Sequence, residues 1–275
     1  MRQWVIFTDL DGTLLDRNTY SFKAAMPALE AVKKEGIPLI LCTSKTRSET
    51  LFWWRTLDLS DPFIIESGGA IVVPPGYFQS LPPQAEKAGD MFLIPLGARY
   101  GQILKGLQKL KDCTQNALRG FSDMTPEEVA KETELSLKFA TLAKQREFDE
   151  PFKFLRDEEE YSGLLPGFVD KMSLRVTKAD RFYHLHGVTD KGKATKMLLE
   201  LLKEKWGEFR NIGIADNEQD LCFLQVVDVP VVIERLRGGF DPILRVNLPQ
   251  ARFVPIPGPM GWNEAVLSLL KEAQK

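Results

Sequence analysis

The sequence predicts an α/β protein with a Rossmann-like parallel sheet, interrupted by an inserted α+β cap domain. Three observations support this. The chain begins with a continuous β-prone apolar run, residues 4–8, which ends in acidic residues, as strands buried on both faces of a parallel sheet do. Strand-like and helix-like segments then alternate up to residue 65. The alternation stops near residue 74 and returns at residue 190.

The first part of the chain has the strand and helix order of right-handed βαβ units. Apolar residues recur at helical spacing over residues 22–32, before a glycine and a proline end the helix. The apolar runs 37–42 and 63–65 are the expected second and third strands. Thr46 and Glu49 have capping-box spacing, which predicts the start of a helix between them. Ligands of such sheets bind at the carboxyl ends of the strands.

Paired prolines mark the place where the alternation stops. Pro74-Pro75-Gly76 and Pro82-Pro83 exclude a helix or a central strand, so we expect a domain hinge there. The elements expected beyond it are a helix over residues 100–107, a capped helix start at residues 125–128, a strand over 152–155, and an antiparallel hairpin of 172–176 and 181–186 with its turn at 178–180.

The α/β alternation returns after the insert. It consists of a helical stripe over residues 194–202, buried strands over 211–215 and 229–233, and a closing helix over 262–270. Each α/β part alone is too small for a good sheet, so we expect the two to join. The sequence therefore predicts a core of residues 1–82 and 188–275 and a cap of residues 83–187.

Composition excludes several classes of protein. The chain has 36 basic and 38 acidic residues, a formal net charge of −2, so it lacks the basic excess of nucleic-acid-binding proteins. Hydrophobic residues make up 44% and charged residues 27%, which is typical of folded globular chains. No apolar stretch approaches the ~20 residues that cross a bilayer. The three cysteines, Cys42, Cys113 and Cys222, are too far apart for a CxxC metal site. We therefore expect a cytoplasmic protein with neither nucleic acid nor membrane as partner.

The strongest chemical signal is Asp9-Leu10-Asp11-Gly12-Thr13, directly after the first strand. Two carboxylates at a strand end suit a nucleophile beside a general acid and base, provided that a cation separates their charges. An EF-hand loop is excluded, because its sixth position, Leu14, is not glycine. A simple Asp-Gly turn is the remaining alternative.

Three further segments have suitable chemistry and position. Thr43 follows the second strand and can donate to a phosphate oxygen, although a helix cap is the alternative. Lys191 stands at a helix start, where its ammonium group and the helix N-terminus both favour an anion; a solvated turn is the alternative. Asp216 and Asp220 follow a later strand and offer oxygen ligands to Mg²⁺; a helix cap is the alternative there.

In this order the four segments resemble the haloacid dehalogenase superfamily of aspartate-nucleophile phosphatases. The resemblance implies that Asp9 forms an aspartyl-phosphate and that Asp11 is the general acid and base. It also implies that Thr43 and Lys191 hold the phosphoryl group. The Mg²⁺ ligands that it implies are Asp9, the carbonyl of Asp11, and Asp216, with Asp220 as a further acidic position.

Six segments look like signatures of the mannosyl-3-phosphoglycerate phosphatase family. They are Thr43–Thr46, Glu66–Gly69, Arg146–Phe152, Arg181–His184, Asp190–Gly192 and Pro257–Asn263. That family converts a sugar phosphoglycerate to the compatible solute mannosylglycerate, so the resemblance implies a small sugar phosphate as substrate. Its cap follows the third core strand, where the paired prolines lie.

Three departures from the family pattern concern the substrate. Ala215 and Gln219 replace a glycine and an asparagine around Asp216, which is itself retained, so we expect metal binding to persist. Ala179-Asp180 replaces a Gly-Gly pair, and Ser67 replaces an asparagine. Asp180 places an acidic residue beside the turn expected to contact the substrate, so we expect it to affect which sugar or anionic group the site admits.

The candidate substrate contacts lie in both domains. They are Ser44, Lys45, Gly68 and Gly69 in the core, and Arg146, Arg181 and His184 in the cap. The cap residues suit the carboxylate of a phosphoglycerate. The alternatives are a salt bridge with a nearby glutamate for Arg146, and packing against Phe182 for His184. A regular strand directs Arg181 and His184 to opposite faces, so both reach the ligand only if Arg181 belongs to the turn.

Three functions remain open at this point. The first is a Mg²⁺-dependent sugar-phosphate phosphatase, for mannosyl-3-phosphoglycerate, its glucosyl analogue or a hexose phosphate. The second is a phosphomutase, which shares the aspartyl-phosphate chemistry but keeps water away from the intermediate. The third is a non-catalytic phosphate-binding protein, which has no need of both Asp9 and Asp11.

Overall fold

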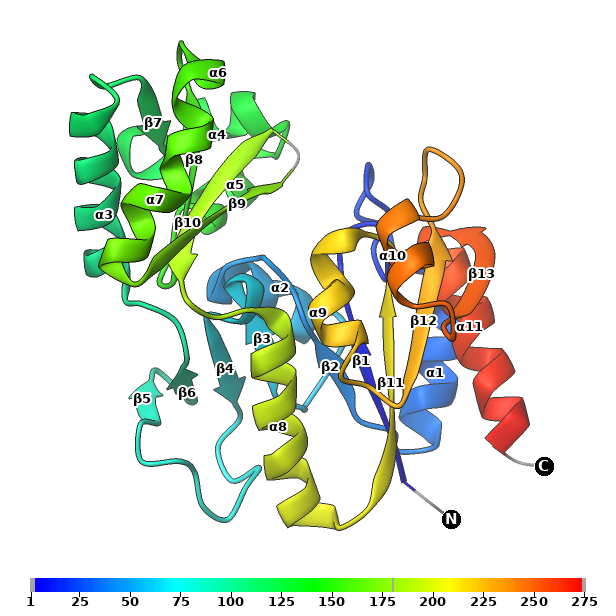
Figure 1. Cartoon of the computed structure of the whole chain (residues 1–275). Helices are drawn as coiled ribbons and strands as arrows, with labels where there is room; N and C mark the ends of the chain where they lie inside the picture. Colours follow the sequence, from blue (N-terminus) through cyan, green and yellow to red (C-terminus); the bar gives the residue numbers. More distant parts are fainter. Residues whose placement is uncertain (1–2, 180, 274–275) are drawn as a thin grey trace.

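A computed structural model describes residues 3–179 and 181–273 of the chain. They form an α/β core with an inserted α+β cap (Figure 1). One sheet has five parallel strands, and two others have four antiparallel strands each. None of the helices in the described ranges is long and apolar enough to cross a membrane.

The parallel sheet has the strand order β13-β12-β11-β1-β2. Its strands are β1 (Gln3–Thr8), β2 (Leu39–Leu41), β11 (Phe209–Ala215), β12 (Val229–Glu234) and β13 (Arg252–Pro257). Four of them lie where the sequence predicts a strand. The fifth, β13, was not predicted, because Val254 is the one buried residue of this edge strand, which also contains two prolines.

Alternate residues of the strands pack against two layers of helices. Ile6 faces one layer, whereas Val5 and Phe7 face the other. The first layer consists of α1 (Met26–Lys34), α2 (Arg47–Thr56) and α11 (Gly258–Ala273). The second consists of α8 (Lys191–Trp206), α9 (Leu221–Leu224) and α10 (Pro242–Asn247). The predicted capping box at the start of α2 is confirmed.

The strand β3 (Phe63–Ile65) differs from the expectation of a third parallel strand. It meets the parallel sheet at a single bridge, Cys42 to Ile64, and pairs antiparallel with β4 (Ala70–Val73). The chain then adds β6 (Met91–Pro95) and β5 (Glu86–Ala88) to the same sheet. A single helical turn, Glu66–Gly68, joins β3 to β4, so the chain returns beside β3 and the two strands are antiparallel.

This pairing also changes where the insert begins. The expected boundary at residue 83 assigns β5 and β6 to the cap, yet both strands belong to the sheet of β3 and β4. The paired prolines stand in the loop between β4 and β5, so they end a strand rather than form a hinge. The chain crosses to the cap at residues 96–99 and returns at 188–190 (Figure 1). The two crossings touch, because an added Cβ at Gly97 would lie 3.2 Å from Cγ2 of Thr189.

The cap is a four-stranded antiparallel sheet covered by helices, in the order β7-β8-β10-β9. Its strands are β7 (Leu118–Gly120), β8 (Asp149–Phe154), β9 (Leu174–Ala179) and β10 (Phe182–Gly187). Its helices are α3 (Tyr100–Cys113), α4 (Pro126–Thr133), α5 (Leu137–Ala143), α6 (Glu158–Tyr161) and α7 (Leu165–Val169). The predicted hairpin is confirmed, although β9 extends into the expected turn; Asp180 lies outside the described residues.

Candidate active site

Asp9 lies directly after β1 and is almost fully buried. Its backbone nitrogen donates to the carbonyl of Ile214 at 3.0 Å, which extends the pairing of β1 with β11 by one residue. Gly12 has a φ of 85°, and an added Cβ there would lie 2.8 Å from Oδ2 of Asp216. A glycine at this turn therefore allows the loop after β1 to approach Asp216 closely.

Lys191 is the first residue of α8 and is buried between two carboxylates. Its Nζ lies 2.8 Å from Oδ1 of Asp9 and 2.5 Å from Oδ1 of Asp220. Burial alone would lower the pKa of Lys191, but the charges of Asp220 and Asp9 hold that pKa well above its ordinary value. The ammonium group is therefore charged at neutral pH.

Asp9, Asp216 and Asp220 form a buried carboxylate triad, in which one oxygen of each lies within 4.8 Å of the others. Burial and then the charge of Asp9 raise the pKa of Asp216 to about 6. The same two causes raise the pKa of Asp220 well above its ordinary value. Lys191 contacts two of these three carboxylates, and the third, Asp216, lies 4.0 Å from a nitrogen of the half-exposed Arg17 guanidinium group. Carboxylate oxygens are the ligands that Mg²⁺ prefers, and a divalent cation would offset the excess negative charge, so the residues fit the metal.

The carboxylate of Asp11 is not part of this triad. Its Oδ2 lies 2.8 Å from Nζ of Lys45, which also lies 3.8 Å from Oε1 of Glu49. Burial would lower the pKa of Lys45, but the charges of Asp11 and Glu49 raise it above its ordinary value. Only the backbone carbonyl of Asp11 remains for the metal role that the sequence suggests, and its side chain faces the pocket.

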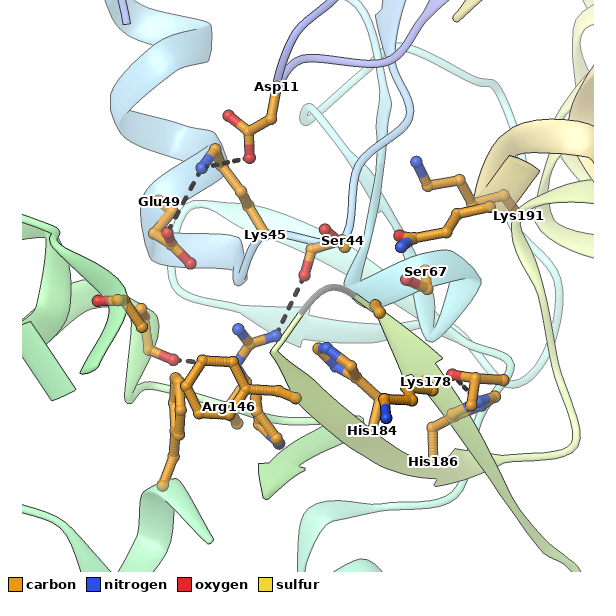
Figure 2. A pocket seen from close by; sticks show the side chains of 18 of the residues that line it. Asp11, Ser44, Lys45, Glu49, Ser67, Arg146, Lys178, His184, His186 and Lys191 are labelled. Carbon is orange, nitrogen blue, oxygen red and sulfur yellow. Dashed lines mark hydrogen bonds and ion pairs between the residues drawn. The ribbon is translucent and has the colours of Figure 1, made fainter. Parts of the chain in front are cut away.

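A pocket of about 350 Å³ lies between core and cap (Figure 2). Its core side includes Asp11, Ser44, Lys45, Ser67 and Lys191. Its cap side includes Arg146, Thr177, Lys178, Phe182, His184 and His186. Basic side chains therefore line both sides, as an anionic ligand requires.

Arg146 and His184, both predicted substrate contacts, meet at this pocket. Nη1 of Arg146 donates to the carbonyl of Ser44 and to Oδ2 of Asp149, each at 3.1 Å. Nδ1 of His184 lies 2.8 Å from the same Asp149 oxygen. The salt bridge that was the alternative role for Arg146 is thus present, but with Asp149 and not with a glutamate. Arg146 also lines the pocket, so the two roles do not exclude each other.

The structure leaves Arg181 outside the pocket. The residue belongs to the turn before β10, as a ligand contact would require, but its guanidinium group pairs with Glu134 at 3.1 Å. The side chain is 59% exposed and does not line the pocket. Turn geometry alone therefore does not bring Arg181 to the ligand.

Three predicted site residues do not line the pocket but pack beside the residues that do: Thr43, Gly68 and Gly69. Oγ1 of Thr43 accepts from the backbone nitrogen of Lys45 at 3.2 Å, and the residue is almost fully buried. An added Cβ at Gly68, where φ is 92°, would lie 2.1 Å from the carbonyl oxygen of Asp190. An added Cβ at Gly69 would lie 2.4 Å from Cβ of Phe148. The glycines thus permit close packing, and Ser67 lines the pocket instead.

Sequence reasoning missed several residues of the site. Thr177 lies opposite His184 in the β9–β10 ladder and lines the pocket, as does Lys178. Strand alternation from His184 would have found Thr177, because paired residues of a hairpin share a face.

Glu66 appeared in the sequence analysis only as part of the family segment Glu66–Gly69, and no role was predicted for it. Its carboxylate accepts from the backbone nitrogens of Glu147 at 3.0 Å and Phe148 at 2.8 Å, which ties the cap to the core.

Comparisons with known proteins agree with this geometry. Residues 6–80 match the model of the haloacid dehalogenase-like hydrolase family. The chain is 38% identical to the glucosyl-3-phosphoglycerate/mannosyl-3-phosphoglycerate phosphatase of Persephonella marina, over 98% of each chain. It is 37% identical to the mannosyl-3-phosphoglycerate phosphatase of Pyrococcus furiosus, over 85% of this chain and 92% of that one.

A solved structure has the same fold. A phosphatase of the haloalkanoate superfamily from Bacteroides thetaiotaomicron superposes with a TM-score of 0.66 at 19% identity, over 98% of this chain and 95% of that one. The similarity to the Persephonella marina relative spans 98% of the chain and therefore covers both core and cap. The chain is therefore a phosphoric monoester hydrolase of the haloacid dehalogenase superfamily and belongs to the family of glucosyl-3-phosphoglycerate and mannosyl-3-phosphoglycerate phosphatases.

Proposed function

We propose that this phosphatase hydrolyses mannosyl-3-phosphoglycerate to mannosylglycerate and phosphate through an aspartyl-phosphate on Asp9. The observation that carries the proposal is the 2.8 Å pair of Lys191 and Asp9 beside a pocket lined with basic groups from both domains. The names of the relatives from Persephonella marina and Pyrococcus furiosus support this substrate. Glucosyl-3-phosphoglycerate is the second candidate, because the first of those names includes it.

In the first step a carboxylate oxygen of Asp9 attacks phosphorus, and the bond from phosphorus to the glycerate oxygen breaks. Asp11 gives its proton to the leaving oxygen. In the second step Asp11 takes a proton from water, whose oxygen attacks phosphorus, and the bond to Asp9 breaks. Lys191 offsets the repulsion between the anionic nucleophile and the anionic phosphoryl group, because its ammonium group already contacts Asp9.

The proposal includes Mg²⁺ at the carboxylate triad. Asp9, Asp216 and the Asp11 carbonyl would hold it, with Asp220 as the further carboxylate nearby. When bound, the ion supplies positive charge that stabilises the phosphoryl oxygens during transfer. Lys45 holds the Asp11 carboxylate at the pocket and apart from the triad, so the metal site does not use its side-chain oxygens.

The cap is proposed to recognise the part of the substrate remote from phosphorus. A sugar 3-phosphoglycerate carries a carboxylate on its glycerate moiety, and Arg146 and His184 present nitrogen donors on the cap side of the pocket. Ser44 and Lys45 face them from the core. The predicted role of Arg181 is not carried forward, because its side chain pairs with Glu134 outside the pocket.

A phosphate-release screen tests the proposal. The substrates are mannosyl- and glucosyl-3-phosphoglycerate, a hexose phosphate and p-nitrophenyl phosphate, each with Mg²⁺ and with EDTA. We expect Mg²⁺-dependent release that is most efficient with mannosyl-3-phosphoglycerate and absent in Asp9→Asn. Preference for the hexose phosphate would overturn the substrate assignment. Isomerisation without net phosphate release would indicate a phosphomutase, and no turnover of any ester would indicate a binding protein.

A further inference from the structure

The chain contains two histidines, and the structure gives them different roles. Both lie on β10 and line the pocket. Nδ1 of His186 lies 2.8 Å from the carbonyl of Gly187, and its Nε2 lies 3.3 Å from Oγ1 of Thr177. A carbonyl only accepts, so Nδ1 donates and Nε2 accepts from the hydroxyl group. Both ring nitrogens of His186 are therefore used within the cap.

His184 has one ring nitrogen available for a ligand. Its Nδ1 lies 2.8 Å from Oδ2 of Asp149, and an ionised carboxylate only accepts, so Nδ1 carries the proton. Within residues 3–179 and 181–273, no hydrogen bond reaches its Nε2. Because the imidazole lines the pocket, this nitrogen is the one that a ligand can meet (Figure 2).

Asp149 is buried behind His184 and does not line the pocket itself. Its Oδ2 accepts from His184 and, at 3.1 Å, from Arg146. Its Oδ1 is buried and accepts no hydrogen bond from the residues that the structure describes. Burial would raise the pKa of Asp149, but His184 and Arg146 hold that pKa below its ordinary value. A buried carboxylate is thus kept ionised by two groups that both line the pocket.

We propose that Asp149 is a positioning residue that fixes the His184 tautomer and directs Nε2 to the carboxylate of the substrate. The inference rests on the proposed function, which supplies a phosphoglycerate ligand. When that carboxylate binds, the imidazole lies between two anions and takes up a proton from solvent. It then donates through Nδ1 to Asp149 and through Nε2 to the ligand.

Two small phosphate esters isolate this contact. 3-Phosphoglycerate carries a carboxylate where glycerol 3-phosphate carries a hydroxymethyl group. Both are measured as inhibitors of p-nitrophenyl phosphate hydrolysis. We expect Asp149→Asn and His184→Gln each to raise the inhibition constant of 3-phosphoglycerate about tenfold, the order of one charged hydrogen bond. The constant for glycerol 3-phosphate is expected to change less than about twofold in both variants.

A double variant and a matched control separate positioning from a loss of structure. Asp149→Asn/His184→Gln is expected to bind 3-phosphoglycerate no more weakly than His184→Gln, because Asp149 acts through the imidazole. Arg146 also contacts Asp149, but the carbonyls of Ala143 and Ser44 still hold its guanidinium group in these variants. The control is Glu150→Gln, the next residue of β8, which is equally buried and accepts from Ser122 and Tyr100 at 2.7 Å each. It is expected to leave both inhibition constants within about twofold of wild type.

Nitrogen NMR of the two imidazoles gives a second readout. In the wild type we expect a protonated Nδ1 on His184 and, after 3-phosphoglycerate binds, a protonated Nε2 as well. Asp149→Asn is expected to change the His184 resonances and Glu150→Gln to leave them unchanged. The wild-type spectrum tests the contact even if Asp149→Asn does not fold, because an unprotonated His184 Nδ1 would contradict it.

Equal increases of both inhibition constants in Asp149→Asn would overturn the proposal, since they would show a general structural role. An additive loss in the double variant would also overturn it, because Asp149 would then act independently of His184. Failure of the proposed function has a different signature. In that case wild-type enzyme hydrolyses p-nitrophenyl phosphate but not mannosyl- or glucosyl-3-phosphoglycerate.

Discussion

Nζ of Lys45 lies 2.8 Å from Oδ2 of Asp11, at the pocket and apart from the carboxylate triad. The other acid of the motif, Asp9, pairs at the same distance with a different cation, Lys191, which also contacts Asp220. Two carboxylates only two residues apart thus have separate cations, which keeps their charges apart. This arrangement is what an attacking carboxylate beside a proton-transferring one requires.

Replacing Asp9 tests covalent catalysis. Asp9→Asn exchanges the anionic nucleophile for an amide of nearly equal shape, so we expect kcat to fall by several orders of magnitude. The thermal unfolding midpoint should change little by comparison. Purified variant is assayed for phosphate release with p-nitrophenyl phosphate. Turnover close to wild type would rule out Asp9 as the nucleophile.

Replacing Lys45 tests how Asp11 is held. Lys45→Met keeps the length of the side chain but removes the ammonium group, which leaves Asp11 and Glu49 without their shared cation. We expect kcat to fall by about tenfold to a hundredfold, a part of what a general acid and base contributes. Lys33→Met is the control, because Lys33 pairs with Asp58 on the surface. A change in KM alone would show that Lys45 binds substrate without acting on Asp11.

Replacing Asp216 tests the metal assignment. Asp216→Ala removes one hard oxygen ligand from the triad, so the Mg²⁺ concentration for half-maximal activity should rise by about tenfold or more. The measurement is a Mg²⁺ titration of phosphate release at fixed substrate. Glu218→Ala, in the same loop but outside the triad, is the control. An unchanged Mg²⁺ dependence in Asp216→Ala would remove Asp216 from the metal site.

The sequence predicted the parallel core well because its strands are buried on both faces. Val5, Ile6 and Phe7 have no exposed surface, so the run is apolar throughout. The same signal is weak for β5, whose residues are exposed or half-buried. Its place beside β6 depends on pairing with a distant segment, which local composition does not encode. The early cap boundary followed from this difference.

The candidate site was predicted best where side chains follow core strands. Asp9 and Asp216 come directly after β1 and β11, and the parallel pairing of those strands brings the two residues together. Residues of the cap depend on the orientation of a hairpin. The turn position of Arg181 left open whether its side chain meets the ligand or Glu134. Asp149 was included only within a family segment, because its contact with His184 joins two strands of the cap and cannot be read from local sequence.

Arg181 now serves as a test of the pocket boundary. Its side chain lies outside the pocket and its exposed ion pair with Glu134 adds little to stability, so Arg181→Ala should change kcat/KM for mannosyl-3-phosphoglycerate by less than about threefold. The same kinetics with p-nitrophenyl phosphate provide the reference. A tenfold loss confined to the large substrate would show that Arg181 leaves Glu134 and reaches the ligand, as the family resemblance implied.

The contact of Glu66 with the cap should make stability depend on pH. Burial raises the pKa of Glu66 from 4.5 to about 8, although Arg146 and the backbone donors of residues 147 and 148 oppose this. The folded protein therefore binds a proton here between about pH 4.5 and pH 8, where the unfolded chain has released it. The stabilisation is fully present below pH 4.5 and is lost as pH rises towards 8.

Glu66→Gln removes this titration but keeps one oxygen, and in the wild type Oε2 alone accepts from the backbone nitrogens of both Glu147, at 3.2 Å, and Phe148, at 2.8 Å. Between pH 5.5 and 7.5 we expect the free energy of unfolding of the wild type to fall more steeply than that of the variant, by up to about 1.4 kcal/mol per pH unit. Urea unfolding at both pH values measures the difference. Asp58→Asn is the control, because Asp58 is exposed and its lowered pKa keeps it ionised throughout this range. Parallel slopes for wild type and Glu66→Gln would show that Glu66 is already ionised at pH 5.5, held by Arg146 and the two backbone donors.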